Sequence, residues 1–208
     1  MSGRPRSGPN VEGMTKLAII YYSSYGTIHS MASRLAATAE ANGAEVRLRR
    51  VRETAPDEVV QSVEPWAAHA ASVADQPVAE PGDLDWADAV IFGSGTRYGH
   101  VTSQLQSFID TLGPLWQEGK LADKVYAAIT SASTLHGGHE TTIEAMHTTF
   151  CHFGGIIVPP GYTDQLKFND GNPYGVSKVA GSDLDDNDHA ALDHLVTRVL
   201  TVAGKLAG

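Results

Sequence analysis

Residues 17–30 read LAIIYYSSYGTIHS, an apolar run that gives way to hydroxyl-bearing side chains and one glycine, Gly26. A run that is apolar at consecutive positions is typical of a strand buried on both faces of a parallel sheet. Apolar residues then recur at helical spacing from Met31 to Ala39. This stretch therefore predicts a strand, a turn and a helix, the opening unit of an alternating α/β domain.

Four further apolar runs continue the alternation, at residues 44–51, 87–94, 124–131 and 155–159. Helical faces lie between and after them, and the side chains that define these faces are Leu105, Phe108, Ile109 and Leu112, then Ile143, Met146 and Phe150, then Leu192, Leu195, Val196, Val199 and Ala203. Right-handed crossovers between such strands produce a doubly wound, five-stranded parallel sheet with helices on both faces. We expect this one domain to span residues 16–208.

Two segments interrupt the rhythm. Residues 53–86 hold four prolines and many alanines, which predicts a loop-rich insertion with short helices. Residues 160–187 are rich in Gly, Asp, Asn and Pro, and we expect a long ordered excursion before the final helix. At the other end, we interpret residues 1–15 as a disordered extension, with Met14 as an alternative start.

Composition narrows the range of functions. A formal net charge of -9 argues against nucleic acid as the main partner, because phosphate backbones require a basic face. The single cysteine, Cys151, excludes an intrachain disulfide and fits a reducing, cytoplasmic location. No stretch approaches the roughly 20 apolar residues of a membrane-spanning helix, so we expect no stable membrane insertion.

The turn after the first strand has the composition of a phosphate cradle. It runs from Ser23 to Ile28 and combines hydroxyls with a glycine at a helix start, where free N–H groups and the helix dipole favour an anion. It lacks both the Lys of a triphosphate-binding loop and the three glycines of a dinucleotide fingerprint. A turn without charge suits a single phosphate monoester, such as that of FMN. The alternative is an ordinary turn in which Thr27 is the helix N-cap.

Two more turns are rich in small residues. Residues 93–100 follow the third strand, and we expect this loop to present backbone groups to a flat ring, with Tyr98 either packing on that ring or on the domain itself. Residues 131–140 follow the fourth strand and lead into a helix. Because the carboxyl ends of parallel strands meet at one edge, the three turns are predicted to converge on one binding crevice.

Other chemistries find less support. The histidines His136, His139, His147 and His152 cluster in the sequence, but no cysteine or carboxylate completes a standard set of metal ligands, so we expect no metal. The residues around Ser94 lack the pattern of a nucleophile elbow, which argues against a hydrolase.

In this order and spacing the motifs resemble the WrbA family of NAD(P)H:quinone oxidoreductases, within the flavodoxin-like superfamily. The motifs that carry the resemblance are residues 21–26, 93 with 96–99, 113–116, 136–142, 158–162, 172–175 and 180–181. The chain departs from the family pattern around the expected ring and substrate pocket, at Gly95, Tyr98, His100 and Leu135.

The resemblance implies an FMN site, and the residues that correspond to it are Ser23, Ser24, Tyr25, Gly26, Thr27 and Ile28 at the phosphate, Thr96, Arg97 and Tyr98 at the ribityl chain and isoalloxazine, Ser133, Thr134, Leu135, His136, Gly137 and Gly138 along the ring, and His152 as a further contact. Tyr25 also matches a position implicated in binding NADH or NADPH. Trp116 matches an aromatic that shapes the substrate pocket and that a neighbouring subunit contributes, because the family forms homotetramers. We expect both irregular segments near the subunit interfaces.

The implied activity is transfer of two electrons from NAD(P)H to a quinone by a ping-pong mechanism, with the flavin rather than any side chain performing the chemistry. His136 is a candidate to hydrogen-bond the quinone oxygen. Two alternatives stay open: a flavodoxin-type electron carrier that docks to protein partners, and a scaffold that has lost its flavin.

Overall fold

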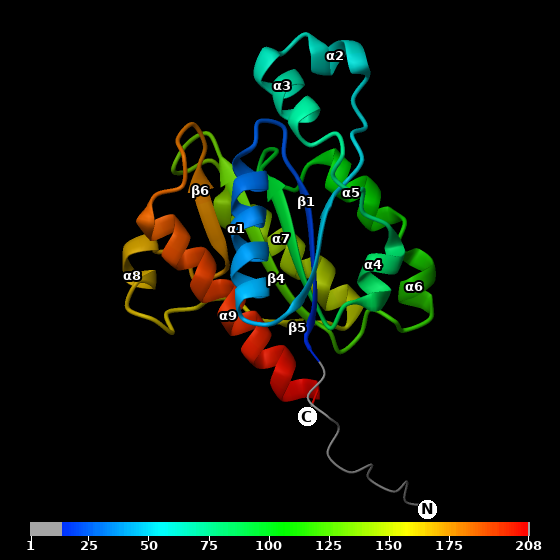
Figure 1. Cartoon of the computed structure of the whole chain (residues 1–208), viewed down its shortest axis with the longest axis vertical. Coiled ribbons are helices and arrows are strands. Elements are labelled where there is room, and N and C mark those ends of the chain that lie inside the picture. The colour runs from blue at the N-terminus through cyan, green and yellow to red at the C-terminus, as the bar shows by residue number, and fades with distance from the viewer. Residues whose placement is uncertain (1–13, 208) are drawn as a thin grey trace, which may run out of the picture.

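A parallel sheet runs through the middle of the molecule in this computed structural model, which describes residues 14–207 (Figure 1). The expected N-terminal extension therefore lies largely outside the described residues. The strand order is β2-β1-β3-β4-β5, and the bounds of these strands are Glu45–Arg50, Lys16–Tyr22, Ala89–Gly95, Val125–Ala132 and Ile156–Ile157. All five strands predicted from the apolar runs are present, and this order confirms the doubly wound topology.

A sixth strand, β6 (Val176–Val179), lies within the predicted excursion and was not predicted. It pairs with the carboxyl-terminal half of β4, where Ile129 is opposite Val176, whereas β5 pairs with the amino-terminal half, where Val125 is opposite Ile156. The two short strands therefore occupy the same edge of β4. The chain between them, including α8 (Lys167–Asp170), leaves this edge and returns to it.

Helices cover both faces of the sheet (Figure 1). The first face packs against α1 (Thr27–Ala41) and α9 (Asp186–Ala207), which Arg34 and Asp193 join by an ion pair. The second face packs against α4 (Pro81–Trp86), α5 (Ser103–Asp110) and α7 (His139–Phe153), and the short α6 (Gly113–Gln117) follows α5. Side chains of the central strands alternate between the two cores, so these strands are apolar at consecutive positions along most of their length.

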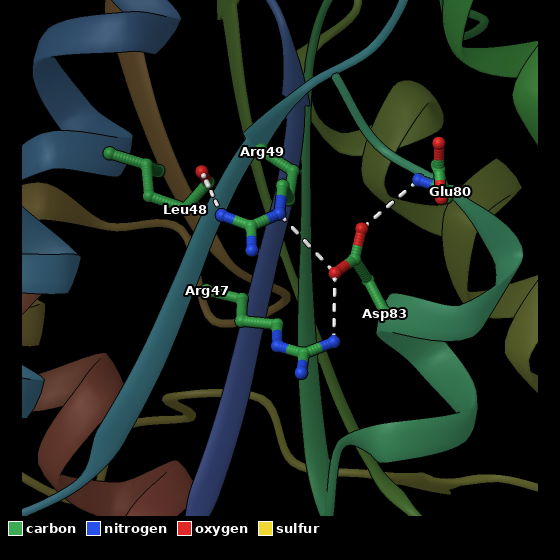
Figure 2. Close-up of polar contacts among 5 residues, drawn as sticks. All are labelled: Arg47, Leu48, Arg49, Glu80 and Asp83. Atoms are coloured by element: carbon green, nitrogen blue, oxygen red, sulfur yellow. Dashed lines mark hydrogen bonds and ion pairs between the residues drawn. The ribbon is translucent and has the colours of Figure 1, made fainter. Parts of the chain in front are cut away.

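The insertion after β2 forms α2 (Asp57–Gln61), α3 (Glu64–Ser72) and α4, as the prediction of short helices required. The first two stand above the sheet edge at which β1 ends (Figure 1). The end of the insertion is tied to β2 by Asp83, which accepts hydrogen bonds from Arg47 at 3.2 Å and Arg49 at 3.3 Å and from the Glu80 amide (Figure 2). This anchor fixes the return of the chain into β3.

Between residues 14 and 207, no helix has both the length and the apolar character needed to cross a membrane.

Candidate functional site

The turn between β1 and α1 leaves the helix start open. Gly26 is the N-cap, with φ of 98°, and no side chain of the described residues caps α1. The alternative with Thr27 as N-cap is therefore wrong, since Thr27 is the first helical residue. The first amides of a helix have no partner within it, and its dipole is positive at this end. The Ser23 hydroxyl accepts a hydrogen bond of 3.0 Å from the Gly26 amide, which holds the turn around this opening.

A hollow of about 100 Å³ lies against this turn. The predicted site residues that line it are Ser23, Ser24, Tyr25, Thr27, Ile28, Thr96, Arg97 and Ser133. A wider hollow of about 580 Å³ adjoins it, shares Tyr25, Thr27 and Ser133 with it, and adds Gly26. The three turns that the sequence placed at one sheet edge thus meet at one concave surface, most of whose polar groups are hydroxyls.

Arg97 supplies the cation that the first turn lacks. Its Nη2 donates a hydrogen bond of 3.1 Å to the Ser24 hydroxyl, although the two residues are 73 positions apart. Its Nη1 donates to the Thr96 carbonyl, which holds the guanidinium in place. The resemblance assigned Arg97 to the ribityl chain and ring, and the structure brings its charge to the first turn, residues 23–28, as well.

Tyr98 extends into solvent at the tip of the second turn. Its side chain is fully exposed and its φ is 53°, an unusual value for a residue other than glycine. Arg97 and His100 exchange two backbone hydrogen bonds, of 2.8 and 3.0 Å, beneath it. The alternative in which Tyr98 packs against the domain is wrong, and its ring is free to contact a ligand or another subunit.

The third turn is held against the second. Thr142, in α7, donates a hydrogen bond of 2.6 Å to the Thr96 hydroxyl. Gly138 caps α7 with φ of 92° and without a side-chain cap from the described part of the chain. A Cβ at Gly138 would lie 2.9 Å from the Gly99 Cα, so this close approach of two backbones requires glycine. The remaining predicted residues of this turn are Thr134, Leu135 and His136, which are exposed, and Gly137, which is half-buried.

His152 and Trp116 lie away from these turns within one chain. The Trp116 indole donates a hydrogen bond of 2.9 Å to the His152 carbonyl, so the two are neighbours. His152 is near the far end of α7, 13 positions after His139 at the helix start, which is a distance of about 20 Å. Both side chains are exposed.

One group at the site was not predicted. Glu53, at the start of the insertion, accepts hydrogen bonds from Tyr22, Trp66 and Gln104. Burial, followed by the hydrogen bond to Glu53, raises the pKa of the Tyr22 phenol far above its ordinary value. The Ser24 hydroxyl lies 3.4 Å from the Tyr22 oxygen, so a chain of hydrogen bonds through Tyr22 and Ser24 links Glu53 to Arg97 at the first turn. A carboxylate soon after a strand end was the only signal in the sequence.

Residues 15–165 match the model of the NADPH-dependent FMN reductase family. The chain belongs to this family. It is 49% identical over 195 residues to an NAD(P)H dehydrogenase (quinone) of Deinococcus radiodurans, covering 93% of this chain and 98% of the relative. It is 41% identical over 204 residues to a protein of the same name from Azorhizobium caulinodans, covering 94% and 100%.

Among solved structures, the chain resembles a WrbA-like flavodoxin protein from Agrobacterium tumefaciens, with a TM-score of 0.67, 25% identity, and 92% and 98% of the two chains covered. An archaeal flavodoxin, at 15% identity and a TM-score of 0.59, shares the fold alone. These matches confirm the flavodoxin-like fold and the resemblance to the WrbA family. The chain is a member of a family of flavin-dependent oxidoreductases.

Proposed function

We propose that this protein transfers two electrons from NADH or NADPH to a quinone through one FMN held at the three turns. The observation that carries the proposal is the hydroxyl-lined hollow at the uncapped start of α1, in a chain nearly half identical to a curated NAD(P)H dehydrogenase (quinone). When bound, FMN supplies the redox chemistry, and the protein supplies binding, orientation and electrostatics.

The site fits the phosphate of FMN. The α1 amides and the hydroxyls of Ser23, Ser24 and Thr27 offer donors without fixed charge, and Arg97 adds one guanidinium. In this proposal residues 23–28 hold the phosphate, Thr96 and Arg97 orient the ribityl chain, and residues 133–138 border the ring.

The exposed aromatics shape the place where substrates bind. Tyr25 and Tyr98 are 60% and 102% exposed, and aromatic faces stack favourably on planar rings. A further hollow of about 700 Å³ is lined by Arg97, His100 and Trp66 among others, and with FMN at the three turns it would give a second ligand room to bind. In this proposal the hollow is a slot that nicotinamide and quinone share. It accepts one planar ring at a time, so the two substrates bind in turn, which is a ping-pong mechanism.

Trp116 and His152 serve a different subunit in this proposal. His152 is about 20 Å along α7 from the turn at the start of that helix, and Trp116 of α6 is beside it; both side chains are exposed. We place them at the flavin of a neighbouring copy within a cytoplasmic homotetramer, with Trp116 over the substrate pocket.

The test is a titration of the purified protein with FMN, followed by steady-state kinetics. FMN should bind with a shift of its visible spectrum, NADH should bleach it under anaerobic conditions, and a soluble quinone should restore it. Initial-velocity lines should be parallel; intersecting lines contradict the shared slot. Slow turnover with quinone, together with a persistent one-electron-reduced flavin, would identify an electron carrier instead.

A further inference from the structure

Two histidines meet behind the phosphate turn. His29 belongs to the first turn of α1 and His69 to α3 of the insertion, and their ring centroids are 5.4 Å apart. A Cβ at Gly26 would lie 3.5 Å from His69 Nδ1, so this imidazole packs directly against the turn. His69 and Ser23 also line one small hollow of about 60 Å³. The insertion therefore brings an imidazole to a turn, residues 23–28, that contains no histidine.

Hydrogen bonding fixes where an added proton goes on His29. The Tyr21 phenol has one proton, which it donates to Gln76 Oε1 at 2.6 Å. His29 Nδ1 lies 2.6 Å from the same phenol oxygen, so Nδ1 is the donor of that pair. The neutral ring then has its unprotonated nitrogen at Nε2, where a second proton can bind.

Both rings lie in surroundings that disfavour their charged forms. Burial lowers the pKa of His29, and burial together with the charge of His29 lowers the pKa of His69. The ionisable groups that face the pair from other elements are Tyr21, Tyr22, Arg50 and Glu53, and burial raises the pKa of the Tyr22 phenol. The pKa of Tyr21 is raised by burial, Arg50 donates to backbone carbonyls, and Glu53 is occupied by three side-chain donors. An anion at the turn would stabilise the protonated form of either imidazole and so raise its pKa.

We propose that His69 and His29 form a proton-accepting counter-charge for the FMN phosphate, so that binding of the phosphate dianion takes up one proton from solvent onto the pair, mainly onto His69. This inference rests on the proposed function, because it requires FMN at this turn. It makes the site selective for FMN over riboflavin, and more selective at lower pH. Since the second pKa of a phosphate monoester is about 6, the phosphate itself takes up almost no proton above pH 7.

The test is calorimetry of flavin-free, full-length protein at pH 7.5 in buffers of different ionisation enthalpy, with FMN and riboflavin as ligands. Wild-type protein should take up about 0.3–1 proton per FMN and none with riboflavin. His69→Gln should abolish most of the uptake and weaken FMN binding about tenfold, the change that one pKa unit represents, without altering riboflavin binding.

Two more variants separate charge from packing. His69→Lys should bind FMN without proton uptake and keep its affinity at pH 8.5, where that of the wild-type protein falls, because lysine stays charged there. His194→Gln is the matched control, since His194 lies on α9 beside Thr163 and should change nothing. Circular dichroism checks that each variant is folded.

FMN binding without proton uptake in the wild-type protein would overturn the inference, as would unchanged uptake in the His29→Gln, His69→Gln double variant. A protein that binds no FMN at all would overturn the proposed function together with this inference, so the two failures are distinguishable.

Discussion

The Tyr22 phenol donates a hydrogen bond of 2.6 Å to the Glu53 carboxylate, which joins the last residue of β1 to the beginning of the insertion. Trp66 of α3 and Gln104 of α5 donate to the same carboxylate, at 3.2 and 2.6 Å. Burial opposes the charge of Glu53, but hydrogen bonds from Tyr22, the Ala55 amide and Gln104 outweigh it, so the pKa of Glu53 lies below its ordinary value. One carboxylate thus holds three elements around the phosphate turn.

Replacing this carboxylate should loosen the insertion. Glu53→Gln forces an amide NH₂ against several donors, and we expect a loss of about 1–3 kcal/mol in the free energy of unfolding, measured by urea denaturation. Glu58→Gln is the control, because Glu58 is exposed on α2 and should change stability by less than about 0.5 kcal/mol. Equal stability of the two variants would show that the network contributes nothing.

The same group predicts a dependence on pH. A carboxyl whose pKa is depressed by folding stabilises the protein above its unfolded pKa of about 4.3, and this contribution is lost as the pH falls through the folded value. The difference in unfolding free energy between wild type and Glu53→Gln should therefore be constant from pH 5 to 7, about 1–3 kcal/mol, and shrink below about pH 4. A difference that grew on acidification would contradict the assignment.

Gly26 and Gly43 form a matched pair for the phosphate turn. Both have positive φ, 98° and 81°, so valine is strained at either position, but Gly43 follows the far end of α1. We expect both Gly→Val variants to lose about 1–2 kcal/mol of stability. Only Gly26→Val should also lose FMN binding, by about tenfold or more, in a fluorescence-quenching titration. Retention of FMN by Gly26→Val would count against the placement of the phosphate.

Asp83 should stabilise the end of the insertion through Arg47 and Arg49 (Figure 2). Its side chain is only 7% exposed, so Asp83→Asn leaves two guanidinium groups without their charge partner, and we expect a loss of about 1–3 kcal/mol in thermal or urea unfolding. Asp85→Asn removes an exposed pair with Lys120, 3.7 Å long, and should cost less than about 1 kcal/mol. A similar loss in both would contradict a special role for Asp83.

Gly155 lies between the end of α7 and the start of β5. A Cβ there would overlap the ring of Tyr126, which itself stacks on Phe150 at 4.8 Å. Gly155→Ala should therefore destabilise the fold by about 1–3 kcal/mol through overpacking. Gly204→Ala provides the contrast, because Gly204 sits in α9 with open space around it and alanine should add about 0.5–1 kcal/mol. Differential scanning fluorimetry should show melting shifts of opposite sign.

The central strands were predictable because burial on both faces makes every residue apolar, as in residues 17–22. The four residues of β6 have no such signal, since Ser177 and Lys178 are only partly buried and pairing with β4 is decided by the tertiary fold. The turns were found through their glycines and hydroxyls. The contacts of Arg97, Glu53 and His69 could not be predicted, because each of them joins elements far apart in sequence. In addition, α3 has no buried residue that would indicate where this helix packs.

The electron density of a crystal soaked with FMN tests the proposed position of the cofactor most directly. The phosphate should lie at the start of α1, within hydrogen-bonding distance of the amides and hydroxyls of residues 23–28 and beside Arg97. The isoalloxazine should border residues 96–98 and 133–138. Density for the flavin at another surface, or clear density for a closed, ligand-free turn at saturating FMN, would contradict it.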